Sequence, residues 1–337
     1  MPRLLQVRNV TKTFGGSFLA KGDVTVAVDD VTFSIEDDKP TMTAIAGESG
    51  SGKTTLALLM MGQIQPSSGS VLYRGRDLAR MPSKERFQLR REVQPIFQDP
   101  FAAYNPFYRV DHVLEVPIKR FGLASSKAAA QKLIGEALET VGLRPAETLG
   151  RFPHELSGGQ RQRLMVARAL LCHPKVVMAD EPVSMVDASL RATILASLRK
   201  LNRDLGISVV YITHDLTTAY QICENILVMY SGAVVGAGSV EQVIGKPKHP
   251  YTQLLISSIP VPGKHERWVG AVTEEAAAGA VRKSTGCKFA PRCPAQMEIC
   301  WDHKPPLYIP DQDRAVACFL YEKSHYLETP DVAQVLR

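Results

Sequence analysis

The sequence predicts an α/β fold, and three short apolar segments carry this prediction. The segments Thr43–Ala46, Val176–Ala179 and Val209–Thr213 each have the length and composition of a buried strand. A helix-like stretch, Thr55–Met61, follows the first of them. Polar residues come directly after each segment, so the functional residues are expected just beyond these strand ends.

The segment between the first strand and this helix is a phosphate-binding loop. Residues 47–54 fit the pattern G-x-x-x-x-G-K-[ST], whose glycines let successive backbone N–H groups point toward phosphate. The N-terminus of the following helix adds about half a positive charge. We expect Lys53 to reach the β- and γ-phosphates of ATP and Thr54 to ligate Mg²⁺; a chance glycine-rich turn is the alternative. The predicted nucleotide-binding residues here are Gly47, Glu48, Ser49, Gly50, Ser51, Gly52, Lys53, Thr54 and Thr55.

Two adjacent carboxylates end the second strand. Successive strand residues point to opposite faces, so Asp180 can hold the Mg²⁺ shell while Glu181 faces an attacking water. Taken alone, the pair before Pro182 could equally be a solvated acidic turn. Beside a phosphate loop it predicts ATP hydrolysis, with Glu181 as the general base.

The segment Leu156–Gln160, Leu-Ser-Gly-Gly-Gln, followed by Arg161–Arg163, resembles the signature motif of ABC ATPases. Its serine and glycines precede a helix predicted over 162–172, which provides a second anion-binding N-terminus. The resemblance implies a P-loop NTPase nucleotide-binding domain with a RecA-like core, an antiparallel β subdomain and a helical subdomain. It also implies a homo- or heterodimer of ABC ATPase subunits, in which one signature closes on ATP held by the other subunit. The signature residues involved are Ser157, Gly158, Gly159 and Gln160.

Three further residues resemble single-residue motifs of this family. Gln98 resembles the loop glutamine that joins the Mg²⁺ and water shell and signals to the membrane partner. His214, directly after the third strand, resembles the switch histidine that contacts the γ-phosphate. Phe14 resembles the aromatic residue that stacks on adenine, with a core aromatic as the alternative and Phe18 nearby. The resemblance therefore adds Gln98 and His214 to the catalytic residues and Phe14 to the nucleotide site.

The loop after the second carboxylate departs from the family pattern. It contains Ser184-Met185-Val186-Asp187, where the family usually has Ser-Ala-Leu-Asp. Asp187 is kept and belongs to the expected nucleotide site. Because Met185 and Val186 are still apolar, the change is expected to alter packing across the dimer interface rather than chemistry.

The expected subdomains can be located along the chain. Alternating, β-branched runs at Leu4–Val10 and Thr25–Ile35 predict the antiparallel subdomain, with a glycine-containing loop over Lys12–Asp23. Residues 84–165 predict a mainly helical subdomain that carries the signature at its end.

An unusual surface stretch follows Gln98. The segment Asp99–Tyr108 contains four aromatic residues and two prolines, a composition suited to binding a short helix of a partner. In the family this region faces the transmembrane subunits. We therefore expect two permease subunits to dock near residues 99–110, with an ordinary buried loop as the alternative.

The C-terminal part indicates a branch of the family. The segment Lys246–Leu255 resembles the tail found in ATPases of oligopeptide and dipeptide importers. A linker-like stretch, Thr273–Ala280, and four cysteines spaced C-x5-C-x6-C-x17-C follow it. These features predict a nucleotide-binding domain over 1–257 and a small cysteine-containing extension over 258–337.

The four C-terminal cysteines predict a metal or cluster site, because a reducing cytosol disfavours disulfides. Both Zn²⁺ and iron–sulfur clusters accept four cysteines, but the close C-x2-4-C pairs typical of zinc are absent. The spacing resembles the C-terminal [4Fe–4S] site of some ATPases in this branch; zinc and unligated thiols are the alternatives. The expected ligands are Cys287, Cys293, Cys300 and Cys318. Cys172 and Cys223 are expected to be buried core thiols.

Composition limits the remaining function classes. The 337 residues carry a net charge of +6, a mild excess that does not call for a nucleic-acid partner. No run approaches the ~18 to 20 apolar residues of a membrane-spanning helix, and the N-terminus lacks a signal-peptide pattern. We therefore expect a soluble subunit that is peripheral to the cytoplasmic face of the membrane.

The resemblance implies a specific activity, ATP hydrolysis that drives a binding-protein-dependent importer of oligopeptides or dipeptides. Short oligosaccharides and nickel are alternative cargoes within the branch. A soluble ABC ATPase acting on ribosomes or DNA is disfavoured, because the chain has one copy of each motif and no long basic stretch.

Overall fold

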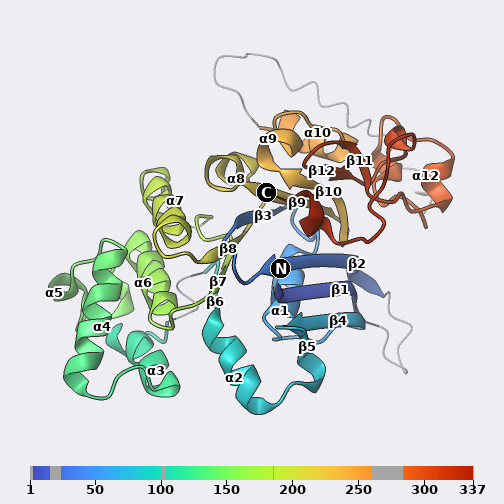
Figure 1. The fold of residues 1–337 in the computed structure, drawn as a ribbon. Coiled ribbons are helices and arrows are strands. Elements are labelled where there is room, and N and C mark those ends of the chain that lie inside the picture. The colour runs from blue at the N-terminus through green and yellow to red at the C-terminus, as the bar shows by residue number, and fades with distance from the viewer. Residues whose placement is uncertain (1–2, 16–23, 100–103, 185, 260–283, 337) are drawn as a thin grey trace.

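The computed structural model describes residues 3–15, 24–99, 104–184, 186–259 and 284–336. Two sheets and a helical lobe make up this part of the chain (Figure 1). No helix in these ranges combines the length and apolarity needed to cross a membrane.

An eight-stranded sheet forms the centre of the molecule, with strand order β11-β12-β10-β9-β3-β8-β7-β6. Its five consecutive strands from β9 to β6 are mutually parallel. They are β3 (Met42–Ala46), β6 (Val93–Ile96), β7 (Val176–Asp180), β8 (Ser208–Thr213) and β9 (Asn225–Tyr230). The residues of β3 and β8 are buried throughout, which explains their continuous apolar composition. The three predicted strands are therefore the neighbours β3, β8 and β7, and their carboxyl ends share one edge of the sheet.

A four-stranded antiparallel sheet, ordered β2-β1-β4-β5, packs on the helix that follows β3. Its strands are β1 (Arg3–Phe14), β2 (Thr25–Glu36), β4 (Ser68–Tyr73) and β5 (Arg76–Asp77), and the helix is α1 (Lys53–Met60). Leu56 and Leu59 of α1 share a core with Leu5 and Phe33 of this sheet. One expectation was wrong, because β1 continues through Phe14 where a loop from Lys12 was predicted, and its last residues pair with the start of β2.

The helical lobe lies on the far side of β6 from the antiparallel sheet (Figure 1). It contains α3 (Asp111–Phe121), α4 (Lys127–Thr140), α5 (Pro145–Thr148), the 3₁₀ turn η2 (Pro153–Glu155) and α6 (Gly158–Leu170). Helix α2 (Ser83–Glu92) leads into β6, and its Leu89 packs in the core of the antiparallel sheet instead. Leu114, Leu138 and Leu164 join three of these helices in one core. Most described elements within residues 84–165 are helices, and β6 within that range belongs to the central sheet. The helix predicted over 162–172 begins earlier, at Gly158, because Ser157 caps its N-terminus.

The C-terminal segment extends the central sheet rather than forming a separate layer. Strand β12 pairs antiparallel with β10, placing Gly236 opposite Val316 and Gly238 opposite Arg314. The elements of this part are β10 (Ala233–Ser239), α9 (Val240–Val243), α10 (Pro250–Ser257), η3 (Ala290–Arg292), α12 (Ile299–Asp302), β11 (Tyr308–Asp311), β12 (Arg314–Val316), η4 (Phe319–Tyr321) and η5 (Val332–Val335). The remaining elements are η1 (Leu78–Arg80), α7 (Ala188–Arg203) and α8 (Leu216–Ile222).

Candidate functional site

The loop between β3 and α1 has a backbone that only glycine permits at two positions. Gly52 has a φ of +98°, and a Cβ atom there would lie 2.0 Å from the Ala27 carbonyl oxygen. At Gly47, a Cβ atom would lie 2.2 Å from the Met229 carbonyl oxygen. Helix α1 begins at Lys53, two residues before the predicted start. The N-terminus of α1 therefore opens directly into the glycine-rich loop.

Lys53 is held beneath this loop. Its side chain is buried, and Nζ donates hydrogen bonds to the carbonyl oxygens of Gly47 and Glu48, both at 2.8 Å. Burial lowers the pKa of Lys53, although the neighbouring carboxylates oppose this shift. The arrangement places an ammonium group where a phosphate bound by the loop would meet it.

Asp180, the last residue of β7, and Thr54, in the first turn of α1, lie together. The two side chains are hydrogen-bonded, and burial raises the pKa of Asp180. Its Oδ1 atom is buried and has no hydrogen-bond partner among the described residues. A hydroxyl beside an unsatisfied carboxylate oxygen is a donor set that Mg²⁺ accepts, so these two residues fit the predicted metal ion.

Glu181 lies between the two other predicted catalytic side chains. Gln98 Nε2 donates to Glu181 Oε2 at 3.0 Å, and His214 Nδ1 lies 2.9 Å from Glu181 Oε1. The backbone of Glu181 has a φ of +43°, and its N–H donates to the Ile212 carbonyl oxygen at 2.9 Å. The structure thus brings together three residues that follow the carboxyl ends of β6, β7 and β8.

The predicted signature forms the N-terminus of α6. Ser157 Oγ accepts a hydrogen bond from the Gln160 N–H at 3.2 Å, and the Ser157 N–H donates to Gln160 Oε1 at 2.9 Å. This reciprocal capping box fixes the start of the helix. A Cβ atom at Gly159 would lie 2.6 Å from Leu190, whereas one at Gly158 would meet nothing within 4 Å. In Figure 1 the signature helix belongs to the helical lobe, while α1 lies beside the antiparallel sheet.

Two predicted nucleotide residues lie at the margins of the site. Phe14 ends β1 and is 46% exposed, with Lys12 Nζ 5.1 Å from its ring centroid. Asp187 precedes α7, and its carbonyl oxygen accepts the first backbone hydrogen bonds of that helix. Phe18 and Met185 lie outside the described residues.

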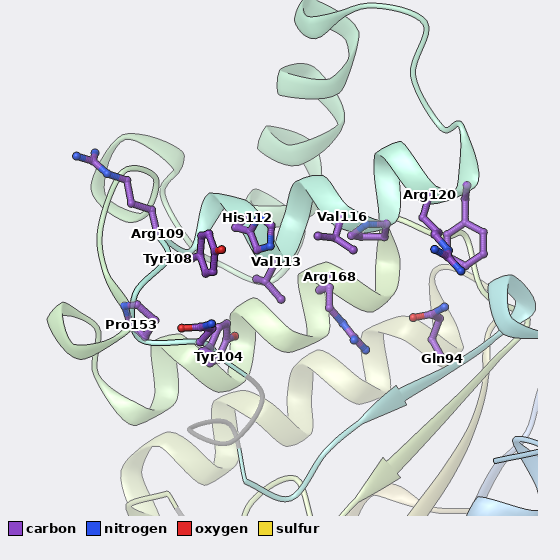
Figure 2. Close-up of a pocket in the computed structure, with 13 residues that line it drawn as sticks. Gln94, Tyr104, Tyr108, Arg109, His112, Val113, Val116, Arg120, Pro153 and Arg168 are labelled. Atoms are coloured by element: carbon purple, nitrogen blue, oxygen red, sulfur yellow. The ribbon is translucent and has the colours of Figure 1, made fainter. Parts of the chain in front are cut away.

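Sequence reasoning missed most of a cavity of about 370 Å³ in the helical lobe. The predicted aromatic stretch supplies Tyr104 and Tyr108 to its wall, but α3 supplies His112, Val116 and Arg120 (Figure 2). These α3 residues recur every four positions, which places them on one helical face, and this spacing was the available signal. Residues 100–103 of the stretch are not described.

The four C-terminal cysteines lie near one another, but the structure shows no formed metal site. Burial raises the pKa of the Cys287, Cys293 and Cys318 thiols, and the other thiols of the group add to the effect. Backbone N–H groups hydrogen-bond to each of these three sulfur atoms. Across the described ranges, no three Cys, His, Asp or Glu side chains are arranged to hold a metal ion. Cys172 and Cys223 are buried in the main core, as predicted.

Comparison with known proteins agrees with the motifs. Residues 28–184 match the ABC transporter family, and residues 235–300 match the C-terminal region of oligopeptide/dipeptide transporters. The chain is 38% identical to the probable peptide ABC transporter ATP-binding protein y4tS of Sinorhizobium fredii, over 94% of this chain and 89% of that protein. It is 37% identical to the dipeptide transport ATP-binding protein DppF of Haemophilus influenzae, over 89% of this chain and 90% of that protein.

The fold has matching solved structures. The dimeric ATP-binding cassette MJ0796, bound to ADP and phosphate, superposes with a TM-score of 0.62 at 28% identity, over 70% of this chain and 98% of that one. A second solved structure, cbiO1 from Clostridium perfringens, part of the ABC transporter complex cbiONQ, superposes with a TM-score of 0.62 at 26% identity, over 73% of this chain and 92% of that one. The chain therefore belongs to the ABC transporter family, within its oligopeptide/dipeptide branch of ATP-binding subunits, which hydrolyse ATP to power transport.

Proposed function

We propose that this chain hydrolyses ATP at the loop Gly47–Thr54 and that hydrolysis drives peptide import through permease subunits. The observation that carries the proposal is the position of Glu181, which is hydrogen-bonded to Gln98 and lies 2.9 Å from His214, next to the Thr54–Asp180 pair. The names of the similar proteins support peptides as the cargo.

The nucleotide is held by the loop and by α1. Backbone N–H groups and Lys53 bind the β- and γ-phosphates, and Phe14 stacks on adenine. Thr54 and Asp180 would hold Mg²⁺, together with Gln98. The ion, when bound, neutralises charge on the phosphate oxygens.

Glu181 serves as the general base. Water attacks the γ-phosphorus while its proton passes to the Glu181 carboxylate, and the bond from phosphorus to the ADP oxygen breaks. Gln98 and His214 hold the two oxygens of this carboxylate in place, and His214 then donates toward the γ-phosphate. ADP and inorganic phosphate are the products.

A second ATPase subunit completes each site. Ser157, Gly158, Gly159 and Gln160 at the N-terminus of α6 bind the γ-phosphate of the neighbouring subunit, and Asp187 lies at the same interface. Open space around Gly158 and the placement of α6 away from α1 support this arrangement. The chain carries one complete set of motifs, which suits a homodimer and a heterodimer equally.

The helical lobe docks the permease subunits at the cytoplasmic face. Phe107 is 87% exposed, and its chain neighbour Tyr108 lines the cavity together with Tyr104 and Val116. An exposed aromatic beside an apolar-walled cavity suits a short helix of a membrane partner. An extracytoplasmic binding protein would deliver the peptide to those permeases.

The four C-terminal cysteines would hold a [4Fe–4S] cluster, with zinc as the alternative. Three of them, Cys287, Cys300 and Cys318, contribute to one small apolar core. Backbone N–H groups hydrogen-bond to the sulfur atoms of Cys287 and Cys318. These donors oppose the effect of burial on the thiol pKa values and so partly favour the thiolate form that both metals require. When bound, the cluster would stabilise the fold of this small segment. Iron and zinc analysis of anaerobically purified protein would distinguish the two metals.

Replacement of the general base tests the catalytic proposal. Glu181→Gln keeps the size of the side chain and one acceptor oxygen but cannot accept the proton, so the hydrolysis rate should fall by about 100-fold or more. The affinity for a fluorescent ATP analogue should stay within about twofold, since Glu181 does not belong to the phosphate loop.

The matched control is Glu115→Gln, which removes an exposed carboxylate that pairs with Lys119 on α3. Its hydrolysis rate should equal that of the wild type. Unchanged hydrolysis in Glu181→Gln would contradict the assignment of the base.

A further inference from the structure

An ion pair joins the cysteine-containing segment to the phosphate loop. The guanidinium group of Arg292 donates two hydrogen bonds to the carboxylate of Glu48, from Nη1 to Oε2 at 3.0 Å and from Nη2 to Oε1 at 3.1 Å. Glu48 is the second residue of the phosphate loop, and Arg292 directly precedes Cys293. Two parallel hydrogen bonds of this kind fix orientation as well as charge.

The turn that carries Arg292 is anchored in the main core. Phe289, at its start, is 1% exposed and lies with its ring centroid 5.2 Å from that of Tyr230 and 5.5 Å from that of Tyr251. The Arg292 guanidinium lies 5.7 Å from the ring centroids of both Tyr230 and Phe289. The aromatic rings therefore restrict where the guanidinium can lie.

A second contact reaches the same loop residue. The Tyr251 hydroxyl accepts a hydrogen bond from the Glu48 backbone N–H at 2.8 Å, and Tyr251 is fully buried. The Glu48 carbonyl oxygen in turn accepts from Lys53 Nζ at 2.8 Å. A change in the position of Glu48 would therefore reach the lysine that is expected to bind phosphate.

We infer that Arg292 is a positioning residue for ATP binding, which neutralises Glu48 and holds the second residue of the phosphate loop in place. This inference rests on the nucleotide site proposed above. An unpaired Glu48 carboxylate would repel a triphosphate and would leave the loop less ordered. The C-terminal segment thereby contributes to ATP affinity from a position 244 residues further along the chain.

Steady-state ATP hydrolysis by the full chain tests this role. Arg292→Ala should raise the KM for ATP by about three- to ten-fold with kcat within about twofold, since the charged pair acts on binding. Arg292→Lys keeps the positive charge but cannot donate two parallel hydrogen bonds to the Glu48 carboxylate, so it should give an intermediate KM. In a Glu48→Gln background, Arg292→Ala should change KM by less than about twofold, because no charge is left to neutralise.

The matched control is Arg3→Ala. Arg3, the first residue of β1, pairs with Asp331 and so forms another ion pair between the C-terminal segment and the nucleotide-binding part. Arg3 lies opposite Glu36 on β2 and is not part of the phosphate loop. The KM of Arg3→Ala should match that of the wild type even if its stability falls. This separates a local effect on the loop from general loosening of the segment.

Lys53→Ala distinguishes a failure of the proposed nucleotide site from a failure of the role assigned to Arg292. This substitution should abolish binding of a fluorescent ATP analogue. Retained binding would contradict the assignment of the nucleotide site to the loop Gly47–Thr54. If Lys53→Ala fails to bind but Arg292→Ala keeps the wild-type KM, the role of Arg292 is wrong. An equal rise in KM for Arg292→Ala with Glu48 or Gln at position 48 would also overturn it.

Discussion

Glu181 has a left-handed backbone conformation that is uncommon for a residue with a side chain. A φ of +43° costs about 1 kcal/mol or more. The hydrogen bond from the Glu181 N–H to the Ile212 carbonyl oxygen and the contacts with Gln98 and His214 hold this conformation. The conformation turns the chain sharply after β7. It thereby separates the directions of the Asp180 and Glu181 side chains, as their two proposed tasks require.

His249, which caps α10, is a histidine whose side chain is buried in the core. It is buried, and its Nδ1 accepts a hydrogen bond from the Tyr251 N–H at 3.0 Å. Burial lowers the pKa of His249 to about 4. The neutral form is therefore the one that the fold requires.

This low pKa predicts acid sensitivity. The unfolded chain binds a proton near the ordinary histidine pKa of 6.5, whereas the folded chain does not until about pH 4. The stabilising contribution is thus complete above about pH 6.5 and falls by up to about 3 kcal/mol as the pH drops toward 4. His249→Asn keeps a cap but cannot titrate, so its free energy of unfolding, measured by urea denaturation, should vary less between pH 7 and pH 5. The same slope in both proteins would contradict this reading of His249.

At the scale of elements, the pairing of β10 with β12 attaches the C-terminal segment to the catalytic sheet. The strands meet where Gly238 lies opposite Arg314, and Gly238 has a φ of +148°. A Cβ atom there would lie 2.2 Å from the Asp313 carbonyl oxygen. Close approach of the two backbones therefore depends on a glycine at this position.

Gly238→Ala should lower the free energy of unfolding by about 1–3 kcal/mol, because the backbone of residue 313 must shift and the pairing of β10 with β12 is weakened. Gly236→Ala on the same strand is the matched control, since its nearest contact would be the Ala315 carbonyl oxygen at an ordinary 3.7 Å. Thermal unfolding should show a lower Tm for Gly238→Ala than for Gly236→Ala. Equal Tm values would show that the strand pairing tolerates a side chain at both positions.

At the scale of the whole molecule, what the sequence could predict depends on the distance between residues along the chain. The loop Gly47–Thr54 is a contiguous motif, and its position between strand and helix was predictable. The meeting of Glu181 with His214 follows from two buried strands that are neighbours in a parallel sheet. The sequence could therefore predict the catalytic residues, because they follow the ends of predicted strands.

Other contacts left no local pattern. Strand β12 has three residues, too few for a periodicity to be visible. Arg292 and Glu48 are 244 residues apart, and an arginine before a cysteine does not indicate its partner. The cavity in the helical lobe combines α3 with β6 and α6, so it depends on how separate elements pack. Such features follow from tertiary packing rather than from local sequence.

The central claim is that ATP hydrolysis by this chain drives peptide uptake, and reconstitution tests it most directly. Proteoliposomes would contain the permease subunits, the partner ATPase if there is one, the binding protein and this chain, with Glu181→Gln as the inactive control. Labelled dipeptide should accumulate with ATP in the wild type and fall to the ATP-free level with Glu181→Gln. Uptake that continues with Glu181→Gln, or ATP hydrolysis without any peptide uptake in the wild type, would contradict the account.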